Sequence, residues 1–490
     1  MKNFLKIGIV VFAISFASCK KDYLDTKPSN GIIETTIYST TASLSSVLNG
    51  TYKSLFAFVS RHDRFGQKSV DLACDLAGAD MVVHTAGYGW FNSNYQYTNW
   101  INSDATTAQP DQFWYYYYDI IKQANQIIAG LDNATGTIFE KESIKGQCLG
   151  LRAYAYYHLI NLFQQTYKGN ENKPGVPIYL TAQITGNPRG TVQNVYDRII
   201  ADLTAAETLL TGKTFTSKVA MSLQVVQGYR ARVALVMEDW TNAATYAAKA
   251  RIGSTLMTTT QYTATSAFSS IAGPECMWGS LIPASEATIY ASFYSHVDVS
   301  TGGYAALGTQ KKITKALYDL MPATDIRKSC FTLPTSTSTS NPAYNQIKMR
   351  VPTAGSWAAD YTYMRASEMY LIEAEALSRK ADDAGARTAL QTLVVARNAS
   401  YSAASLSGAA LLSEILLQRR IELWGEGFSM IDIKRLKTGL NRLTGAGNHG
   451  SPSLDPIVYT MADADPRFIL RLPKRELDNN TSMTPADQNP

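Results

Sequence analysis

The segment from Tyr88 to Trp100 holds the residue types best suited to binding an uncharged ligand. Six aromatic rings fall within residues 88–100, separated by glycine, amide and small polar side chains. A flat ring can stack on the apolar face of a sugar while a neighbouring amide hydrogen-bonds its hydroxyl groups, and the same groups suit a peptide. The segment therefore predicts a platform for a glycan or a peptide.

A second aromatic-rich stretch, residues 252–360, carries two further tryptophans. Because Trp is seldom left on a long polar loop unless it packs or binds, we expect both stretches to contribute rings to one face. The candidate ligand-binding residues are Tyr88, Trp90, Asn94, Tyr95, Trp100, Trp278 and Trp357. For each ring the alternative is that it packs its loop onto the body of the protein.

The sequence carries none of the common catalytic motifs. HExxH, GxSxG and P-loop patterns are absent, and the five histidines have no mutual ligand spacing. Paired carboxylates such as Glu373 and Glu375 do occur, and spacing alone does not exclude the acid and nucleophile of a glycosidase. We expect a binding protein, not an enzyme, with no cofactor and no metal site, and keep a glycoside hydrolase as the less favoured alternative.

Residues 1–18 have the pattern of a bacterial lipoprotein signal peptide. Lys2 and Lys6 precede an apolar run over residues 8–16, which is too short to span a bilayer, and small residues then lead to Cys19. Cys19 is therefore expected to carry the lipid anchor, with residues 19–40 as a tether at a membrane surface. An ordinary signal peptide with an incidental Cys19 is the alternative.

The composition after the signal peptide fits a folded body on such a tether. No run of eighteen or more apolar residues follows, and a formal net charge of +5 without a basic cluster argues against nucleic acid as a partner. The remaining cysteines lack CxxC spacing and are expected to be buried thiols, although their disulfide state stays open. They are Cys74, Cys148, Cys276 and Cys330.

The elements that must position these residues are mainly helical. Apolar residues recur with helical period over residues 111–131, 142–167, 193–210, 217–251, 361–399 and 410–437. A single body over 41–490 is expected, with a helical frame at 41–58, 111–251 and 361–437. Long irregular insertions at 59–110, 168–192 and 252–360 carry the ligand face, and 438–490 forms a C-terminal segment.

Two helical stretches share one pattern of small and apolar residues. Positions +12, +16 and +19 after a leading alanine are occupied alike in both copies, at Ala231, Ala243, Ala247 and Ala250 and at Ala374, Ala386, Leu390 and Leu393. Small residues at these positions let two antiparallel helices pack closely, which is typical of a tetratricopeptide repeat. A generic helical hairpin is the alternative.

Motifs along the whole chain resemble those of one family. The matching segments are C-K-K-D-Y-L-D at 19–25, W-x3-Y-x2-I-x3-N at 114–125, R-A-x3-Y at 152–157, R-x-x-E-x-x-L-x-x-A-E-A at 365–376, R-R-x-E-L-x-x-E-G at 419–427, D-x-x-R at 432–435, P-x-x-E at 473–476 and Q-N-P at 488–490. Together they resemble the SusD/RagB-like outer-membrane lipoproteins of Bacteroidetes. Ser429 departs from the pattern, because the family usually has a basic residue there.

The resemblance implies a cell-surface lipoprotein of the outer membrane that captures a nutrient, in the manner of starch-binding proteins of polysaccharide utilisation. It implies a SusC-like TonB-dependent transporter as the partner that receives the glycan. Capture of peptides by the same architecture and a tetratricopeptide scaffold that binds proteins are the alternatives. The charged motif residues are expected to lock the frame through pairs one helical turn apart, such as Arg365 with Glu368 and Arg419 or Arg420 with Glu422 and Glu426.

Overall fold

The computed structural model describes residues 38–98, 100–101 and 108–490. The signal peptide, Cys19 and nearly all of the 19–40 tether lie outside these residues, so those expectations stay predictions. Within the described part, no helix combines the length and the apolar character needed to cross a membrane.

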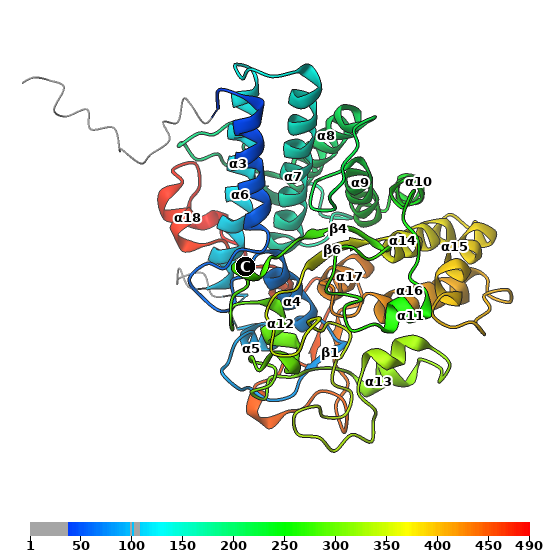
Figure 1. The fold of residues 1–490 in the computed structure, drawn as a ribbon. Coiled ribbons are helices and arrows are strands. Elements are labelled where there is room, and N and C mark those ends of the chain that lie inside the picture. The colour runs from blue at the N-terminus through cyan, green and yellow to red at the C-terminus, as the bar shows by residue number, and fades with distance from the viewer. Residues whose placement is uncertain (1–37, 99, 102–107) are drawn as a thin grey trace, which may run out of the picture.

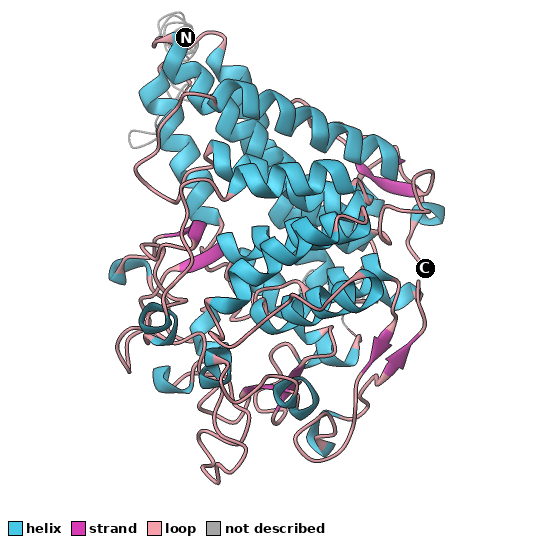
Figure 2. Cartoon of the chain, turned by 90° about the vertical axis from the view of Figure 1, so that its right-hand side faces the viewer, coloured by secondary structure: helices cyan, strands magenta, loops and turns pink. Residues whose placement is uncertain are grey.

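The expectation of a mainly helical frame is confirmed. Its helices are α3 (Thr41–Ser54), α6 (Gln109–Leu131), α7 (Ile138–Phe163), α8 (Val192–Leu210), α9 (Leu223–Met237), α10 (Trp240–Ala250), α14 (Ala366–Arg379), α15 (Asp383–Val395), α16 (Gly408–Glu422) and α17 (Ser429–Leu436). From α3 and α6 to α10 each helix packs on the next, α10 packs on α14, and α14 packs on α15 and α16. The array sweeps across Figure 1, and Figure 2 shows the long helices in the upper part of the view with most of the loops below them.

The two repeat-like hairpins have matching turns. Glu238 and Ala381 each adopt a left-handed backbone with φ near 60°, which ends the first helix. The following Asp239 and Asp382 then accept a hydrogen bond from the backbone three residues on and cap the second helix. All eight residues of the repeat pattern are buried, as close packing of the paired helices requires.

Two expected helices are interrupted. Residues Tyr361–Arg365 form strand β6 instead of the start of a helix, and they pair antiparallel with β4 (Cys276–Ser280). The stretch 410–437 breaks between α16 and α17, where Gly425 and Gly427 have positive φ. A Cβ on Gly427 would lie 2.8 Å from the backbone of Asp71 in α4 (Gln67–Leu76), so close packing on this helix requires glycine there.

The insertion 59–110 is less irregular than its composition predicts. It contains α4 (Gln67–Leu76), in which every residue is buried. The other short elements are α5 (Asn92–Gln96), α11 (Thr259–Thr263), α12 (Phe293–Val297), α13 (Lys315–Asp319), α18 (Lys474–Asn479), β1 (Met81–Val83), β2 (Pro174–Pro177), β3 (Arg189–Thr191), β5 (Lys311–Ile313), β7 (Leu440–Asn441) and β8 (Thr460–Met461). The strands pair antiparallel as β1 with β5, β2 with β3, β4 with β6, and β7 with β8.

The charged motif residues do form buried networks, but not the expected pairs within one helix. Arg365 bridges Glu275 at 2.7 Å, Glu422 at 3.1 Å and Glu426 at 2.6 Å, and so joins β6 to the ends of β4 and α16. Glu368 instead pairs with Arg232 of α9 at 2.7 Å. The reason for the difference is that Arg365 ends a strand, so its side chain does not follow the helical spacing.

The other two arginines of the motif also pair across elements. Arg419 binds Asp432 of α17 at 2.7 Å, and Arg420 binds Asp80 at 2.6 Å. The four cysteines are free and buried, which agrees with the expected thiols.

Candidate ligand-binding site

Four of the predicted site residues lie in the interior. Asn94 bonds Gln109, the Tyr95 hydroxyl bonds His449, and both side chains are fully buried. Trp100 is 1% exposed and belongs to the main core. A buried side chain offers no surface to a ligand, so we leave these residues out of the candidate site.

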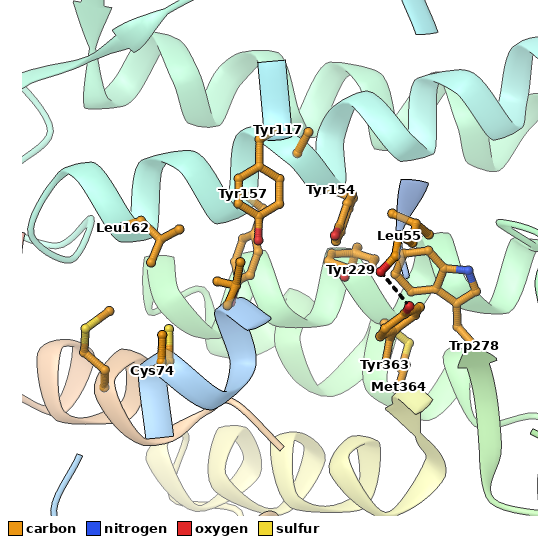
Figure 3. Close-up of a cluster of buried hydrophobic side chains, with 14 of the residues drawn as sticks. Leu55, Cys74, Tyr117, Tyr154, Tyr157, Leu162, Tyr229, Trp278, Tyr363 and Met364 are labelled. Atoms are coloured by element: carbon orange, nitrogen blue, oxygen red, sulfur yellow. Dashed lines mark hydrogen bonds between the residues drawn. The ribbon is translucent and has the colours of Figure 1, made fainter. Parts of the chain in front are cut away.

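Trp278 is the fourth of these residues and lies in the core near Tyr154, Tyr229 and Tyr363 (Figure 3). Its indole packs edge-on against Tyr154 at 5.3 Å and Tyr363 at 5.1 Å between ring centroids. The indole N–H donates to the Val219 carbonyl at 3.0 Å, so the polar atom of the buried ring is satisfied. Strand β4 thus uses Trp278 to attach the insertion to the frame helices.

The remaining three predicted residues, Tyr88, Trp90 and Trp357, belong to one group of touching rings. We call this group the aromatic cluster, and its members are Phe58, His62, Tyr88, Trp90, Tyr290, Tyr304 and Trp357. Tyr88 is 68% exposed, Phe58 40% and Tyr290 38%, whereas Tyr304 is buried and the other three rings are partly buried. The structure therefore brings together rings from both insertions on the surface.

The contacts within the aromatic cluster run through His62 and Tyr304. His62 lies 5.6 Å from Trp90, 6.2 Å from Tyr290 in a stacked geometry, and 6.1 Å from Phe58. Tyr304 lies 5.5 Å from Tyr88 and 5.4 Å from Tyr290, which in turn lies 5.7 Å from Trp357. These distances place ring faces and edges from five chain segments in one continuous array.

A buried histidine packs against the aromatic cluster. His296 of α12 stacks on Tyr304 at 5.0 Å and lies 5.4 Å from Phe65. Its Nε2 donates to the His62 carbonyl at 2.8 Å, and burial lowers the pKa of His296 to about 3. His296 is therefore neutral, and the His62 Nδ1 to Tyr304 hydroxyl bond of 2.6 Å fixes the ring above it.

Local backbone geometry explains the exposure of Tyr88. Gly87 and Gly89 on either side have φ of 48° and 83°, a region that favours glycine. A Cβ on Gly87 would lie 2.2 Å from the Thr309 side chain, so glycine allows the loop after β1 to pack closely there. The loops that carry most of the cluster flank α5 and α12 below the frame helices (Figure 1).

Charged groups beside the aromatic cluster already form ion pairs or hydrogen bonds within the protein. The Arg61 guanidinium lies 5.2 Å from the Trp90 ring centroid and binds Asp63 through two hydrogen bonds of 3.1 and 3.2 Å. Asp298 accepts from the backbone of Ser300 and of Val351. These two carboxylates hold the loops in place, and the arrangement suits stacking of a ligand on the rings.

Two family models match most of the chain. The one described as "Starch-binding associating with outer membrane" matches residues 22–235, and the SusD family model matches residues 328–490. The chain belongs to the SusD/RagB-like family. The resemblance inferred from the sequence motifs is therefore confirmed.

A curated SusD-like relative supports the family at lower coverage. SusD-like protein P2 of Formosa agariphila is 25% identical over 244 residues, which are 50% of this chain and 45% of that protein. The match thus spans less than half the length of that relative.

Solved structures share the fold over nearly their whole length. A SusD-like carbohydrate binding protein from Bacteroides vulgatus is 26% identical, with a TM-score of 0.79 over 92% of this chain and 98% of that one. Surface glycan-binding protein A from Bacteroides fluxus has a TM-score of 0.69 at 17% identity over 92% of this chain and 99% of that one, which shows the shared fold alone.

Sequence reasoning missed four members of the aromatic cluster, namely Phe58, His62, Tyr290 and Tyr304. Tyr290 and Tyr304 lie in the same insertion as Trp357, so counting every aromatic ring there, and not tryptophan alone, would have included them. Phe58 and His62 come after the end of α3 and carry no pattern of their own. Only the tertiary contacts with Trp90 and Tyr304 identify them.

Proposed function

We propose that the protein is a cell-surface lipoprotein that captures a glycan on the aromatic cluster and passes it to a SusC-like TonB-dependent transporter in the outer membrane. The observation that carries this proposal is the convergence of rings from five segments, with Tyr88, Phe58 and Tyr290 substantially exposed. Ring faces in such an array suit the apolar faces of successive sugar units.

The family supports the same proposal. One of its models is described as starch-binding and associated with the outer membrane, and the Bacteroides vulgatus structure is a carbohydrate binding protein. The lipid anchor at Cys19, the transporter partner and delivery to it rest on the family resemblance and the sequence signal. We include them in the proposal as its cellular setting.

Glycan capture can be tested with a panel of polysaccharides and an oligopeptide mixture. The form lacking residues 1–19 would be run in native gels containing starch, xylan, mannan or galactan, and binding would be quantified by calorimetry. We expect retardation in at least one polysaccharide gel. We expect calorimetry to show no binding of comparable strength to the peptide mixture. Binding of the peptides alone would favour the peptide alternative, and no binding of either class would favour a protein scaffold.

A triple variant, Trp90→Ala with Tyr290→Ala and Trp357→Ala, tests whether the aromatic cluster binds the glycan. Removing three stacking rings should abolish detectable retardation while the circular dichroism stays helical. Phe139→Ala removes an exposed ring on α7 outside the cluster and serves as the matched control. Full binding by the triple variant would place the site elsewhere.

Two further measurements address the remaining parts of the proposal. Chromatography of the bound polysaccharide after long incubation should show no shorter products, whereas product release would favour a glycoside hydrolase.

Cys19→Ala should move the protein from the membrane fraction to the soluble fraction. Retention of that variant in the membrane would contradict the lipid anchor.

A further inference from the structure

A pocket of about 340 Å³ lies between the paired strands β1 and β5 and the loop 444–451. We call it the β1–β5 pocket. It is lined by residues 82–84, by Lys312 of β5 and by several residues of the loop, and no aspartate or glutamate is among these described lining residues. It shares no residue with the aromatic cluster, and its volume is large enough for a small ligand.

Two basic side chains of the β1–β5 pocket have no partner in the protein. Lys312 lies opposite Val82 in the strand register and His84 follows Val82 by two residues, so both side chains lie on the same face of the ribbon. Both are partly buried, and over residues 38–98, 100–101 and 108–490 neither side chain has a hydrogen bond or an ion pair. Burial lowers the pKa of Lys312, and burial together with the Lys312 charge lowers the pKa of His84.

Two other lysines differ from Lys312 because their ammonium groups have acceptors. Lys311 donates to the Thr309 carbonyl at 2.5 Å, and Lys434 donates to the carbonyls of Asn161 and Gln164, both at 2.6 Å. Burial lowers the pKa of both lysines to about 7, yet their bonds to carbonyls give them a structural role. Within the described chain the Lys312 ammonium has no such acceptor and lines an open volume.

The loop 444–451 adds a neutral donor to the pocket. The Asn448 Oδ1 accepts from the Ala316 backbone N–H at 3.1 Å, and its amide N–H groups have no acceptor among the described residues. His449 anchors the loop, because its Nε2 donates to the Ala79 carbonyl at 2.8 Å and its Nδ1 accepts from the Tyr95 hydroxyl. Burial lowers the pKa of His449 to about 4, so this ring is neutral. The pocket thus combines hydrogen-bond donors with a positive charge, which suits an anion.

The β1–β5 pocket lies close to the aromatic cluster. His84 precedes Tyr88 by four residues, so their Cα atoms are at most about 14 Å apart. The backbone N–H of Ala86, between them, donates to the Ser453 hydroxyl at 3.0 Å and ties this segment to the chain that follows the pocket loop. A glycan of a few sugar units is long enough to reach both places.

We propose that the β1–β5 pocket binds the acidic group of a glycan unit, a carboxylate or a sulfate, while neighbouring units stack on the aromatic cluster. The inference rests on the proposed glycan capture and adds the class of glycan, which is an acidic one. Lys312 supplies the charge, and His84 and Asn448 donate N–H groups to the oxygens of the anion. An anion there also offsets the cost of holding two basic groups together in a poorly hydrated place.

The test uses the whole mature chain with galacturonate, galactose 6-sulfate and galactose as probes. Calorimetry should give saturable one-site binding of at least one acidic sugar, and the tighter of the two identifies the group as carboxylate or sulfate. Galactose, which has the same ring without the charge, should bind at least tenfold more weakly. No saturable binding of either acidic sugar, or equal affinity for galactose, would overturn the site. Acetate or inorganic sulfate bound as tightly as the acidic sugar would overturn its assignment to a glycan.

Variants and chemical modification locate the acidic sugar. Lys312→Gln should weaken its binding at least tenfold, whereas Lys249→Gln removes an exposed lysine of α10 and should leave the affinity unchanged. Should Lys312→Gln fail to fold, brief acetylation of the parent gives the location, because the acidic sugar should slow modification of Lys312 and not of Lys249. Unchanged affinity in folded Lys312→Gln, or unchanged acetylation of Lys312, would overturn the proposal.

Polymers separate this inference from the proposed function. Polygalacturonate should bind more tightly than its methyl ester, or a sulfated galactan more tightly than its desulfated form, according to which acidic sugar binds. Lys312→Gln should remove this preference alone, whereas the triple variant of the aromatic cluster should weaken binding of both forms. If no polymer binds, glycan capture fails while the acidic sugar still decides the pocket. Binding of the acidic sugar without preference for the acidic polymer would overturn the link between the pocket and the cluster.

Discussion

The helical frame and the aromatic cluster differ in where their characteristic side chains lie. The frame buries its charged motif residues, whereas the cluster exposes several of its large rings. In the frame, Arg365 and Glu422 are buried and each contacts several partners of opposite charge. In the cluster, Tyr88 and Tyr290 remain exposed although they are large and partly apolar. The motif residues therefore hold the structure together, while the rings on the loops are available to a ligand.

This difference separates the motif residues, which stabilise the fold, from the exposed rings, which are available to a ligand. Burial and multiple ion pairs make Arg365 and Glu426 sensitive to replacement for structural reasons. Exposure makes Tyr88 tolerant to replacement as far as stability is concerned, so a loss of function there reports on binding. Separate measurements of stability and affinity distinguish the two regions.

The largest effect is expected for Arg365→Met. Removing the guanidinium leaves Glu275, Glu422 and Glu426 buried without one of their partners, which should lower the free energy of unfolding by about 3 to 5 kcal/mol. Urea titration measures this loss. Lys474→Met removes the exposed pair with Asp478 and should cost less than about 1 kcal/mol, and a similar loss in both variants would contradict the distinction.

The two tryptophans of the second insertion should behave in opposite ways. Trp278→Ala opens a cavity in the core and should cost about 3 to 5 kcal/mol of unfolding free energy. Trp357→Ala, on the partly exposed cluster, should cost less than about 1 kcal/mol and weaken glycan affinity. Thermal melting and calorimetry on both variants test this, and a larger stability loss in Trp357→Ala would move that ring to the core.

Acid should weaken the frame through Glu426. Although burial opposes ionisation, Arg365 and Lys348 lower the pKa of Glu426 to about 2, below its unfolded value near 4.5. The ionised carboxylate therefore stabilises the fold above pH 4.5, and this contribution is lost as pH falls toward 2, by at most about 1.4 kcal/mol per pH unit. Urea unfolding of Glu426→Gln between pH 7 and 3 should show a flatter decline than the parent. An unchanged slope would mean that other carboxylates dominate.

The smallest effect is expected for Tyr88→Ala. The ring makes one edge contact with Tyr304 and otherwise faces solvent, so stability should change by less than about 0.5 kcal/mol. Affinity for the polysaccharide that retards the parent most should fall by roughly 0.5 to 1.5 kcal/mol. Native gels and melting curves give both quantities, and unchanged affinity would leave Tyr88 outside the ligand contact.

The sequence alone determined the helical frame, the paired hairpins and the family. These features are local, because apolar period, alanine spacing and capping aspartates such as Asp239 act within one helix or one turn. The buried thiols were also expected from the absence of CxxC spacing. One helix boundary depends on tertiary contacts, since strand pairing with β4 overrides the helical pattern at residues 361–365.

Only the tertiary structure decided which rings face solvent and which charges pair. Trp278 and Trp357 lie in the same polar insertion, yet one is enclosed by frame tyrosines and the other lies on the surface, and no local pattern separates them. The partners of Arg365 come from residues 57 to 90 positions away. Such contacts depend on how irregular loops fold over the frame, which periodicity in a single chain does not encode.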